Sequence, residues 1–399
     1  MATQAELLAM MDRYIVPNYA RRHRAMVRGR GATVWDADGN EYVDFFAGFG
    51  GAGTVGHCHP RVVEAVRKQA ETLFCHGNFF TNANELALAA RLNEHAFAGK
   101  VFYCHSGAEA NEAALKLVRL AARQAAPAGA PMKYKIISFH HCFHGRTMGA
   151  LSLTPEKFQE GFEPMLPGNV KVDYGDLDGV AAAVDDQTAG VFVEPIQAEG
   201  GMNVPTAEFM QGLRKLCDAR GLLLVVDEVW TGPARTGRWF AHQHYGIVPD
   251  VMTLAKAVGG GAPVGVCLAA GKYGDVLGPG KHGCTMGGNP LCTAAALEAM
   301  RVIEDEKLVD RAAVKGLMLT GAIRDAKVPC VRDVRGKGML IGLELDESKV
   351  AKEVFLAALA AGLFVAPADK NVLRLAPPLV IDDATLAKGL DILLKVLRA

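Results

Sequence analysis

Residues 221–229 read Gly-Leu-Leu-Leu-Val-Val-Asp-Glu-Val and are the clearest structural signal in the chain. The unbroken leucine and valine run predicts a strand over 222–227 that is buried on both faces, as in a parallel sheet. A second apolar run at 251–254 ends in Ala255 and Lys256, about 30 residues after Asp227. Because open α/β sheets bind ligands at the carboxyl ends of their strands, these two polar strand ends predict a functional site there.

The same pattern continues on both sides of this centre. Apolar runs predict further strands at 101–104, 135–139, 190–194 and 264–269, and helices such as 108–123 and 206–220 separate them. Strands that alternate with helices are typical of an α/β fold with a mostly parallel sheet.

The two ends of the chain have a different pattern. Residues 28–46 predict paired strands around a turn, and the part after about 295 begins with a long helix and then mixes strands and helices. We therefore expect a large domain over residues 47–294 and a smaller α+β domain assembled from residues 1–46 and 295–399.

The composition excludes several classes of protein. The chain has 399 residues, 50% of them hydrophobic, and its 43 basic and 43 acidic side chains leave no net charge, so nothing indicates a nucleic-acid or membrane-surface partner. The most apolar run, 354–366, is too short to cross a bilayer. Nine cysteines without regular spacing favour free thiols in a reducing compartment. We expect a cytoplasmic protein that binds neither nucleic acid nor membrane.

Four motifs suggest chemistry, and each also has a purely structural interpretation. Asp227 could pair with a protonated ring nitrogen or a metal, or only form a cap or an ion pair. Lys256 could be a nucleophile with a depressed pKa, or an exposed strand end. Ser106, before a helix, could help to bind an anion or act as a plain N-cap. Residues 139–147 contain three histidines and a cysteine, but their spacing matches no standard zinc site, so no metal is expected.

A glycine-rich segment at 48–53 imitates a dinucleotide-binding loop. It matches the pattern G-x-G-x-x-G, which requires a helix that opens within it and an acidic residue at the end of the next strand. The predicted helix begins only near Pro60, and Glu71 falls inside that helix. We therefore interpret the segment as part of the entrance to a site and expect no nicotinamide cofactor.

The four motifs together favour one cofactor, pyridoxal 5′-phosphate. A lysine would hold its aldehyde, an aspartate its pyridine nitrogen and a helix start its phosphate, while an aromatic side chain stacks on the ring. At this point the chain resembles the class III pyridoxal-phosphate aminotransferases of fold type I, and within them the acetylornithine/ornithine group. Eight segments carry the resemblance in family order: 56–60 (GHCHP), 106–111 (SGAEAN), 143–147 (FHGRT), 194–201 (EPIQAEGG), 227–229 (DEV), 253–256 (TLAK), 285–290 (TMGGNP) and 373–378 (LRLAPP).

The resemblance implies a role for each matching cofactor residue. Lys256 corresponds to the Schiff-base lysine that also moves the proton, and Asp227 to the aspartate that keeps the pyridine nitrogen protonated. The resemblance further implies that the cofactor lies among Ser106, Gly107, Ala108, Phe143, His144 and Val229, with Phe143 stacking on the ring and Val229 packing beneath it. Thr285 matches a threonine that contacts the phosphate of the neighbouring subunit's cofactor, which implies a homodimer with shared active sites.

Five further residues are implied in substrate binding. Arg146, assisted by Tyr19, matches the arginine that binds a substrate carboxylate, and Phe49 lies near a position that tunes the choice of donor. Glu199 and Arg374 resemble a switch pair. Glu199 neutralises Arg374 while a diamino donor is bound, and it swings away when Arg374 binds the α-carboxylate of glutamate or 2-oxoglutarate, a contact suited to a bidentate arginine.

The chain departs from the family pattern in two places. Trp230 replaces a glutamine whose amide contacts the phenolic oxygen of the cofactor, and an indole offers only an N–H donor. The loop over 45–55 is glycine-rich and one residue longer than usual. Either change could alter the choice of substrate, although Trp230 could also be an ordinary packing residue.

The predicted function is a ping-pong transaminase that moves an amino group from an ornithine-like or other ω-amino donor to a 2-oxo acid, with 2-oxoglutarate as the expected acceptor. The alternatives are a transaminase for 4-aminobutyrate or another ω-amino acid, and a pyridoxal-phosphate enzyme of another class, such as an aminomutase, racemase or decarboxylase. A binding protein that keeps only the scaffold is disfavoured, because Lys256 and Asp227 are both present.

Overall fold

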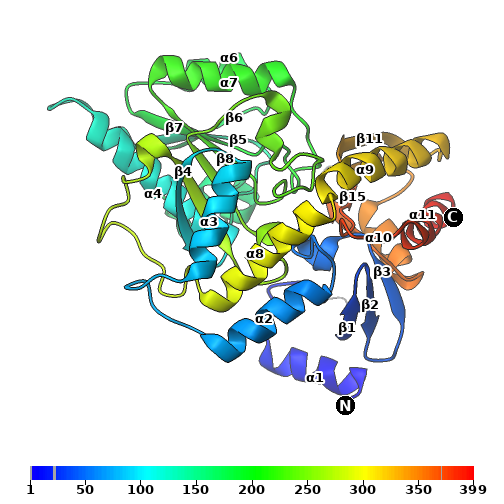
Figure 1. The fold of residues 1–399 in the computed structure, drawn as a ribbon. Helices are drawn as coiled ribbons and strands as arrows, with labels where there is room; N and C mark the ends of the chain where they lie inside the picture. The colour runs from blue at the N-terminus through cyan, green and yellow to red at the C-terminus, as the bar shows by residue number, and fades with distance from the viewer. Residues whose placement is uncertain (1, 21–23, 370) are drawn as a thin grey trace.

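The molecule is built around one seven-stranded sheet, shown in Figure 1 as a computed structural model that describes residues 2–20, 24–369 and 371–399. The strand order is β4 (Gly99–Cys104), β10 (Gly265–Ala270), β9 (Val251–Leu254), β8 (Leu223–Asp227), β7 (Thr188–Val193), β5 (Lys135–Phe139) and β6 (Asn169–Val172). Only β10 runs antiparallel to its neighbours, and the other pairs are parallel. The predicted mostly parallel α/β sheet is confirmed, whereas β6 was not predicted.

Strand β8 shows why its sequence is apolar without interruption. Leu223 and Val225 belong to the core beneath α4 (Gly107–Ala125), whereas Leu224 and Val226 belong to the core beneath α7 (Ala207–Arg220). Successive side chains of a strand point to opposite faces of the sheet. Because helices cover both faces, no position of β8 can be polar until the strand reaches Asp227 at its end.

The helices around this sheet have clear sequence stops. Helix α7 begins after its N-cap Thr206 and ends at Gly221, whose φ of 62° lies in the left-handed region that favours glycine. The remaining helices of the large sheet region are α2 (Pro60–Thr72), α3 (Ala83–His95), α5 (Met148–Leu153), α6 (Leu177–Ala183) and α8 (Pro290–Asp305), with short turns η2 (Glu156–Phe158), η3 (Ala241–Tyr245), η4 (Lys256–Gly259) and η5 (Gly271–Tyr273). Within the described residues, no helix is both long and apolar enough to cross a membrane.

The two ends of the chain meet in a smaller sheet. Strands β1 (Met26–Arg30), β2 (Thr33–Asp36) and β3 (Glu41–Asp44) are antiparallel, and β13 (Leu363–Phe364) joins β3 in parallel. Helix α1 (Gln4–Tyr14) precedes this sheet in the chain. One hydrophobic core includes Val43 and Phe45 from the first part of the chain and Leu363 and Leu393 from the last part.

The C-terminal part adds a second four-stranded sheet. It is antiparallel, in the order β11 (Val331–Lys337), β12 (Leu340–Leu345), β15 (Val372–Leu375) and β14 (Ala366–Ala368). Helices α9 (Leu308–Asp325), α10 (Ala351–Ala360) and α11 (Asp383–Arg398) pack beside these strands and beside β3 and β13 (Figure 1).

The glycine-rich segment 48–53 contains no dinucleotide loop. Residues Ala47–Gly51 form one short π-helical turn, η1, and the next helix, α2, begins at Pro60 with Glu71 inside it. The geometry that a dinucleotide loop requires is therefore absent here, as the sequence predicted.

Candidate active site

The polar side chains predicted at the strand ends lie together around a pocket of about 490 Å³. Strand β8 ends at Asp227, Lys256 follows β9 after the single residue Ala255, and β4 leads into the start of α4 at Ser106. The segment after β5 adds Phe143 and His144. Gly107, Ala108 and Val229 also line this pocket. The carboxyl ends of four strands thus bring the predicted cofactor residues other than Thr285 to one place.

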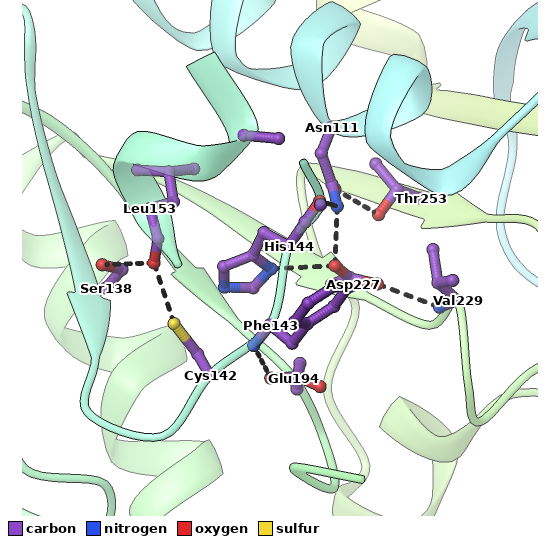
Figure 2. A network of polar contacts seen from close by, with 12 residues as sticks. Asn111, Ser138, Cys142, Phe143, His144, Leu153, Glu194, Asp227, Val229 and Thr253 are labelled. Carbon is purple, nitrogen blue, oxygen red and sulfur yellow. Dashed lines mark hydrogen bonds and ion pairs between the residues drawn. The ribbon is translucent and has the colours of Figure 1, made fainter. Parts of the chain in front are cut away.

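The carboxylate of Asp227 is held in a fixed orientation (Figure 2). Its Oδ2 accepts hydrogen bonds from Asn111 Nδ2 at 2.7 Å and from His144 Nδ1 at 2.8 Å, and its Oδ1 accepts one from the amide of Val229 at 3.0 Å. Asn111 is itself fixed, because its Oδ1 accepts from Thr253 Oγ1 at 2.8 Å. Sequence reasoning gave Asn111 no role, although the residue stands inside the motif 106–111.

The His144 imidazole is buried between Asp227 and Cys142. Burial alone would lower the pKa of His144, but the nearby Cys142 sulfur and the Asp227 carboxylate outweigh burial and raise this pKa above its ordinary value. The histidine cluster in 139–147 does not converge, since His141 Nδ1 instead lies 3.2 Å from Asp369 Oδ2.

Lys256 begins η4 with a φ of 41°, a left-handed conformation that residues other than glycine rarely adopt. Its side chain lies in the pocket, and Nζ is 4.6 Å from the centroid of the Trp230 ring. Burial lowers the pKa of Lys256, and this effect exceeds the opposing attraction of Glu199 and Asp227. A larger fraction of this amine is therefore uncharged at neutral pH than for a free lysine, as a nucleophilic lysine requires.

The start of α4 is capped by Ser106 and also lines the pocket. Ser106 Oγ accepts from the amide of Glu109 at 3.2 Å, so Ser106 is an N-cap. Gly107 and Ala108 follow in the first turn, where helix amides have no partner within the helix, and both line the pocket. Gly107 has to be small, because a Cβ atom there would lie 2.8 Å from a Val229 methyl group.

Phe143 is held through its backbone. Its amide donates to Glu194 Oε2 at 2.9 Å, and burial raises the pKa of Glu194 well above its ordinary value. Sequence reasoning placed Glu194 in a family motif but did not identify this contact.

A second pocket of about 850 Å³ adjoins the first and shares Tyr19, Phe143 and Arg146 with it. The guanidinium carbon of Arg146 lies 4.1 Å from the centroid of the Phe158 ring and 5.5 Å from that of Phe143. These ring contacts leave the N–H groups of Arg146 available to an anion. Glu199 also lines this second pocket.

Glu199 and Arg374 form the predicted ion pair. Arg374 Nη1 lies 2.8 Å from Glu199 Oε1, and Arg374 is only 6% exposed. Burial would raise the pKa of Glu199, but the charge of Arg374 and the hydrogen bonds from Arg374 and Trp230 lower it below its ordinary value. The guanidinium of Arg374 also donates from Nη2 to the carbonyl of Pro367 at 3.2 Å.

Two predicted residues are not brought into this arrangement. Thr285 is exposed on the segment before α8 and lines neither of the two pockets. Phe49 lies in η1, and its side chain is outside the described part of the chain.

The groups around the first pocket fit pyridoxal phosphate. The buried carboxylate of Asp227 suits a protonated ring nitrogen, the amine of Lys256 suits an aldehyde, and the first-turn amides of α4 suit a phosphate. All three line the same pocket.

Comparison with known proteins agrees with this geometry. A sequence profile described as "Aminotransferase class-III" matches residues 14–397. The acetylornithine aminotransferase of Mycolicibacterium smegmatis is 48% identical over 94% of both chains, and that of Caldanaerobacter subterraneus is 41% identical over 98% of this chain and 99% of its own. The crystal structure of the ornithine aminotransferase from Toxoplasma gondii superposes with a TM-score of 0.93 at 36% identity, covering 100% of this chain and 95% of that one. The chain therefore belongs to the class III aminotransferases and is a pyridoxal-phosphate-dependent enzyme.

Proposed function

We propose that the protein is a transaminase that takes the ω-amino group of an ornithine-like donor, such as an N-acylated ornithine, and passes it to 2-oxoglutarate. The observation that carries this proposal is the Glu199–Arg374 ion pair, 2.8 Å long, beside a pocket that also contains Arg146. The reacting end of an ω-amino donor has no carboxylate, whereas the reacting end of a 2-oxo acid has one. An arginine that can be neutralised or released by a neighbouring glutamate allows one site to accept both.

In our proposal some residues of the site act on the cofactor and the reacting proton, and others bind the carboxylates of the substrates. Pyridoxal phosphate, when bound, supplies an electron sink for the carbon that loses its proton. In our proposal Asp227 keeps a proton on the ring nitrogen, and Lys256 Nζ accepts the proton from the substrate carbon that bears the amino group. Arg146, with Tyr19 beside it, binds the α-carboxylate of the donor. Arg374 binds the α-carboxylate of the acceptor once Glu199 has moved away.

We also infer a homodimer in which Thr285 reaches the neighbouring active site. Large apolar side chains are exposed between α2 and α3, where Phe74 is 62%, Phe79 98% and Phe80 78% exposed. This connection is tied to the Thr285 segment, since Asn78 Nδ2 donates to the carbonyl of Cys284 at 2.6 Å. Exposed apolar surface of this kind is typical of a protein–protein interface.

The proposal also includes two domains and a location in the cytoplasm. We assign cofactor binding to residues 47–294 and a smaller domain to residues 1–46 and 295–399, which the pairing of β3 with β13 supports. The nine cysteines are all free thiols, which favours a reducing compartment and hence the cytoplasm.

A half-reaction screen tests the proposal. Enzyme loaded with pyridoxal phosphate is mixed, without an acceptor, with N-acetylornithine, ornithine or 4-aminobutyrate, and the visible absorbance of the cofactor is followed. We expect an ornithine-type donor to bleach it fastest and 2-oxoglutarate to restore it. Faster bleaching by 4-aminobutyrate would assign a different donor, and release of carbon dioxide or isomerisation of the substrate would replace transamination altogether.

A further inference from the structure

Trp230 touches both members of the Glu199–Arg374 pair. It follows β8 in the chain, is 6% exposed, and packs against Phe46 with ring centroids 5.4 Å apart. Its Nε1 donates to Glu199 Oε1 at 3.1 Å, and the guanidinium carbon of Arg374 lies 5.3 Å from the centroid of its ring. The oxygen that accepts the indole N–H is the same atom that pairs with Arg374.

The segment η1 is shaped to receive this indole. Gly51 has a φ of 78°, and a Cβ atom there would lie 2.3 Å from Cζ3 of Trp230. Among the described residues other than its two chain neighbours, no atom lies within 4 Å of the corresponding position at Gly50, in the same turn. The glycine-rich loop and Trp230, which are the two departures from the family pattern, are therefore one structural unit.

We propose that Trp230 is a specificity-determining positioning residue, whose indole N–H holds Glu199 on Arg374 and thereby disfavours the binding of dicarboxylates. The inference rests on the proposed function, in which Arg374 has to leave Glu199 before it can bind an acceptor. Release of Arg374 here requires the carboxylate to give up two contacts, the ion pair and the indole N–H. Donors that leave the pair closed do not have to break either contact.

The size of the effect follows from the type of hydrogen bond. A hydrogen bond to a charged acceptor changes an equilibrium by about 10- to 100-fold. Removing the indole N–H alone should therefore strengthen dicarboxylate binding by about that factor. The ring contacts to Phe46 and Arg374 are not part of this effect, because a phenyl ring can replace them.

The experiment measures the binding of glutarate, a dicarboxylate without a reactive carbonyl, to the cofactor-loaded enzyme by calorimetry. Trp230→Phe keeps an aromatic ring and removes the N–H, so its Kd for glutarate should fall about 10- to 100-fold. The KM for 2-oxoglutarate should fall with it, while the KM for the amino donor should not fall. An unchanged glutarate Kd in Trp230→Phe would overturn the inference.

Glu199→Gln separates this outcome from a failure of the proposed function. Its neutral side chain frees Arg374, so it should bind glutarate more tightly than the parent enzyme. If Glu199→Gln binds glutarate more tightly than the parent enzyme and Trp230→Phe does not, the role proposed for Trp230 is wrong. The proposed exchange of Arg374 between Glu199 and a dicarboxylate is then still supported. If neither variant binds glutarate better than the parent enzyme, the switch pair itself is wrong, and the inference falls with it.

A glycine pair in η1 provides a matched control. Gly51→Ala should push the indole away from Glu199 and strengthen glutarate binding, whereas Gly50→Ala should leave the glutarate Kd unchanged. Glutarate should also alter the indole fluorescence of the parent enzyme and alter that of Trp230→Phe much less. Equal glutarate affinities in the two alanine variants would contradict the coupling between η1 and Trp230. If Gly51→Ala does not fold, the glutarate Kd of Trp230→Phe still tests the role of Trp230.

Discussion

Lys256 combines three features: a position just after a strand, a left-handed backbone and a depressed pKa. The last two are costly, since a φ of 41° stores strain and burial disfavours the ammonium form. Other contacts in the fold have to offset these costs. Their concentration at one residue is expected of a group selected for reactivity rather than for stability.

Replacing Lys256 by alanine should therefore abolish turnover. The expected loss is at least about 10⁴-fold in kcat, since both the anchor and the proton-transfer group disappear. The measurement is a steady-state assay with the donor found in the half-reaction screen. Lys100→Ala is the matched control, because Lys100 is an exposed lysine paired with Asp275 at 2.7 Å, and it should keep normal activity. Near-normal transamination by Lys256→Ala would contradict the assigned role.

The reactivity of Lys256 should also show in a pH profile. Only the uncharged amine attacks an aldehyde, and burial lowers the pKa of Lys256 from 10.5, so apoenzyme should recapture pyridoxal phosphate with a midpoint below that value. The rate should rise with pH through this lowered pKa and then level off. Return of visible absorbance in stopped-flow measurements gives the profile. Pyridoxal without phosphate should show the same midpoint, whereas a midpoint that moves with the phosphate would assign the titration to another group.

The sequence allowed some of the site residues to be predicted and not others. Asp227 and Lys256 stand out because each follows an apolar strand, and that contrast is local. Asn111 and Glu194 do not stand out, since their roles depend on partners 116 and 51 residues away in the chain, Asp227 and Phe143. The contact between Trp230 and Glu199 could not be predicted either, because these residues are 31 positions apart in the chain.

At the scale of elements, the strands with continuous apolar runs were predicted to within two residues at each end. Strands β5 and β9 have the predicted bounds, and β8 begins one residue later than expected. Strand β6 was missed because only Val172 among its four residues is buried, so it has no apolar run. The turn η1 was missed because its glycines have little local preference, and its shape depends on the Trp230 ring that Gly51 contacts.

Two glycines of α9 should respond to alanine in opposite directions. A Cβ atom at Gly316 would lie 2.1 Å from the carbonyl oxygen of Gly338. In the described part of the chain, a Cβ atom at Gly321 would meet nothing within 4 Å beyond its chain neighbours and the backbone of its own helix. Gly316→Ala should therefore lower the free energy of unfolding by about 1–3 kcal/mol, because backbone has to move. Gly321→Ala should raise it by about 0.5–1 kcal/mol through helix propensity. Denaturant unfolding of both variants checks the signs, and equal effects would mean that α9 does not approach Gly338 so closely.

At the scale of the whole molecule, the sequence pattern predicted that both chain ends build the smaller domain, but it did not predict which strands join them. Nothing in the local pattern of 41–44 or 363–364 indicates that these short strands pair, because pairing across such a distance leaves no periodic signal. In the structure, side chains from both ends of the chain pack into one hydrophobic core. Phe45 packs so closely on α11 that a Cβ atom at Gly389 would lie 2.4 Å from its ring.

The proposed dimer leads to a prediction about Phe79 and Phe80. If both are buried between subunits, changing both to serine should weaken association at least about 10-fold, since apolar anchors dominate such interfaces. Sedimentation velocity across a concentration series measures this. Val248→Ser, at a valine that is 54% exposed, is the matched control and should leave association unchanged. A Phe79→Ser/Phe80→Ser double variant that stays dimeric at the same concentrations would place the interface elsewhere.

The parallel pairing of β3 with β13 also has a consequence for how the protein is made. The ribosome releases β3 about 320 residues before β13, which at roughly 5–20 residues per second is a wait of roughly 16–64 s. Throughout that interval one edge of the nascent N-terminal sheet has no partner, and an unpaired edge invites pairing with other chains. The edge of β3 therefore needs shielding during that interval, and its protection from hydrogen exchange should appear only after β13 has been synthesised.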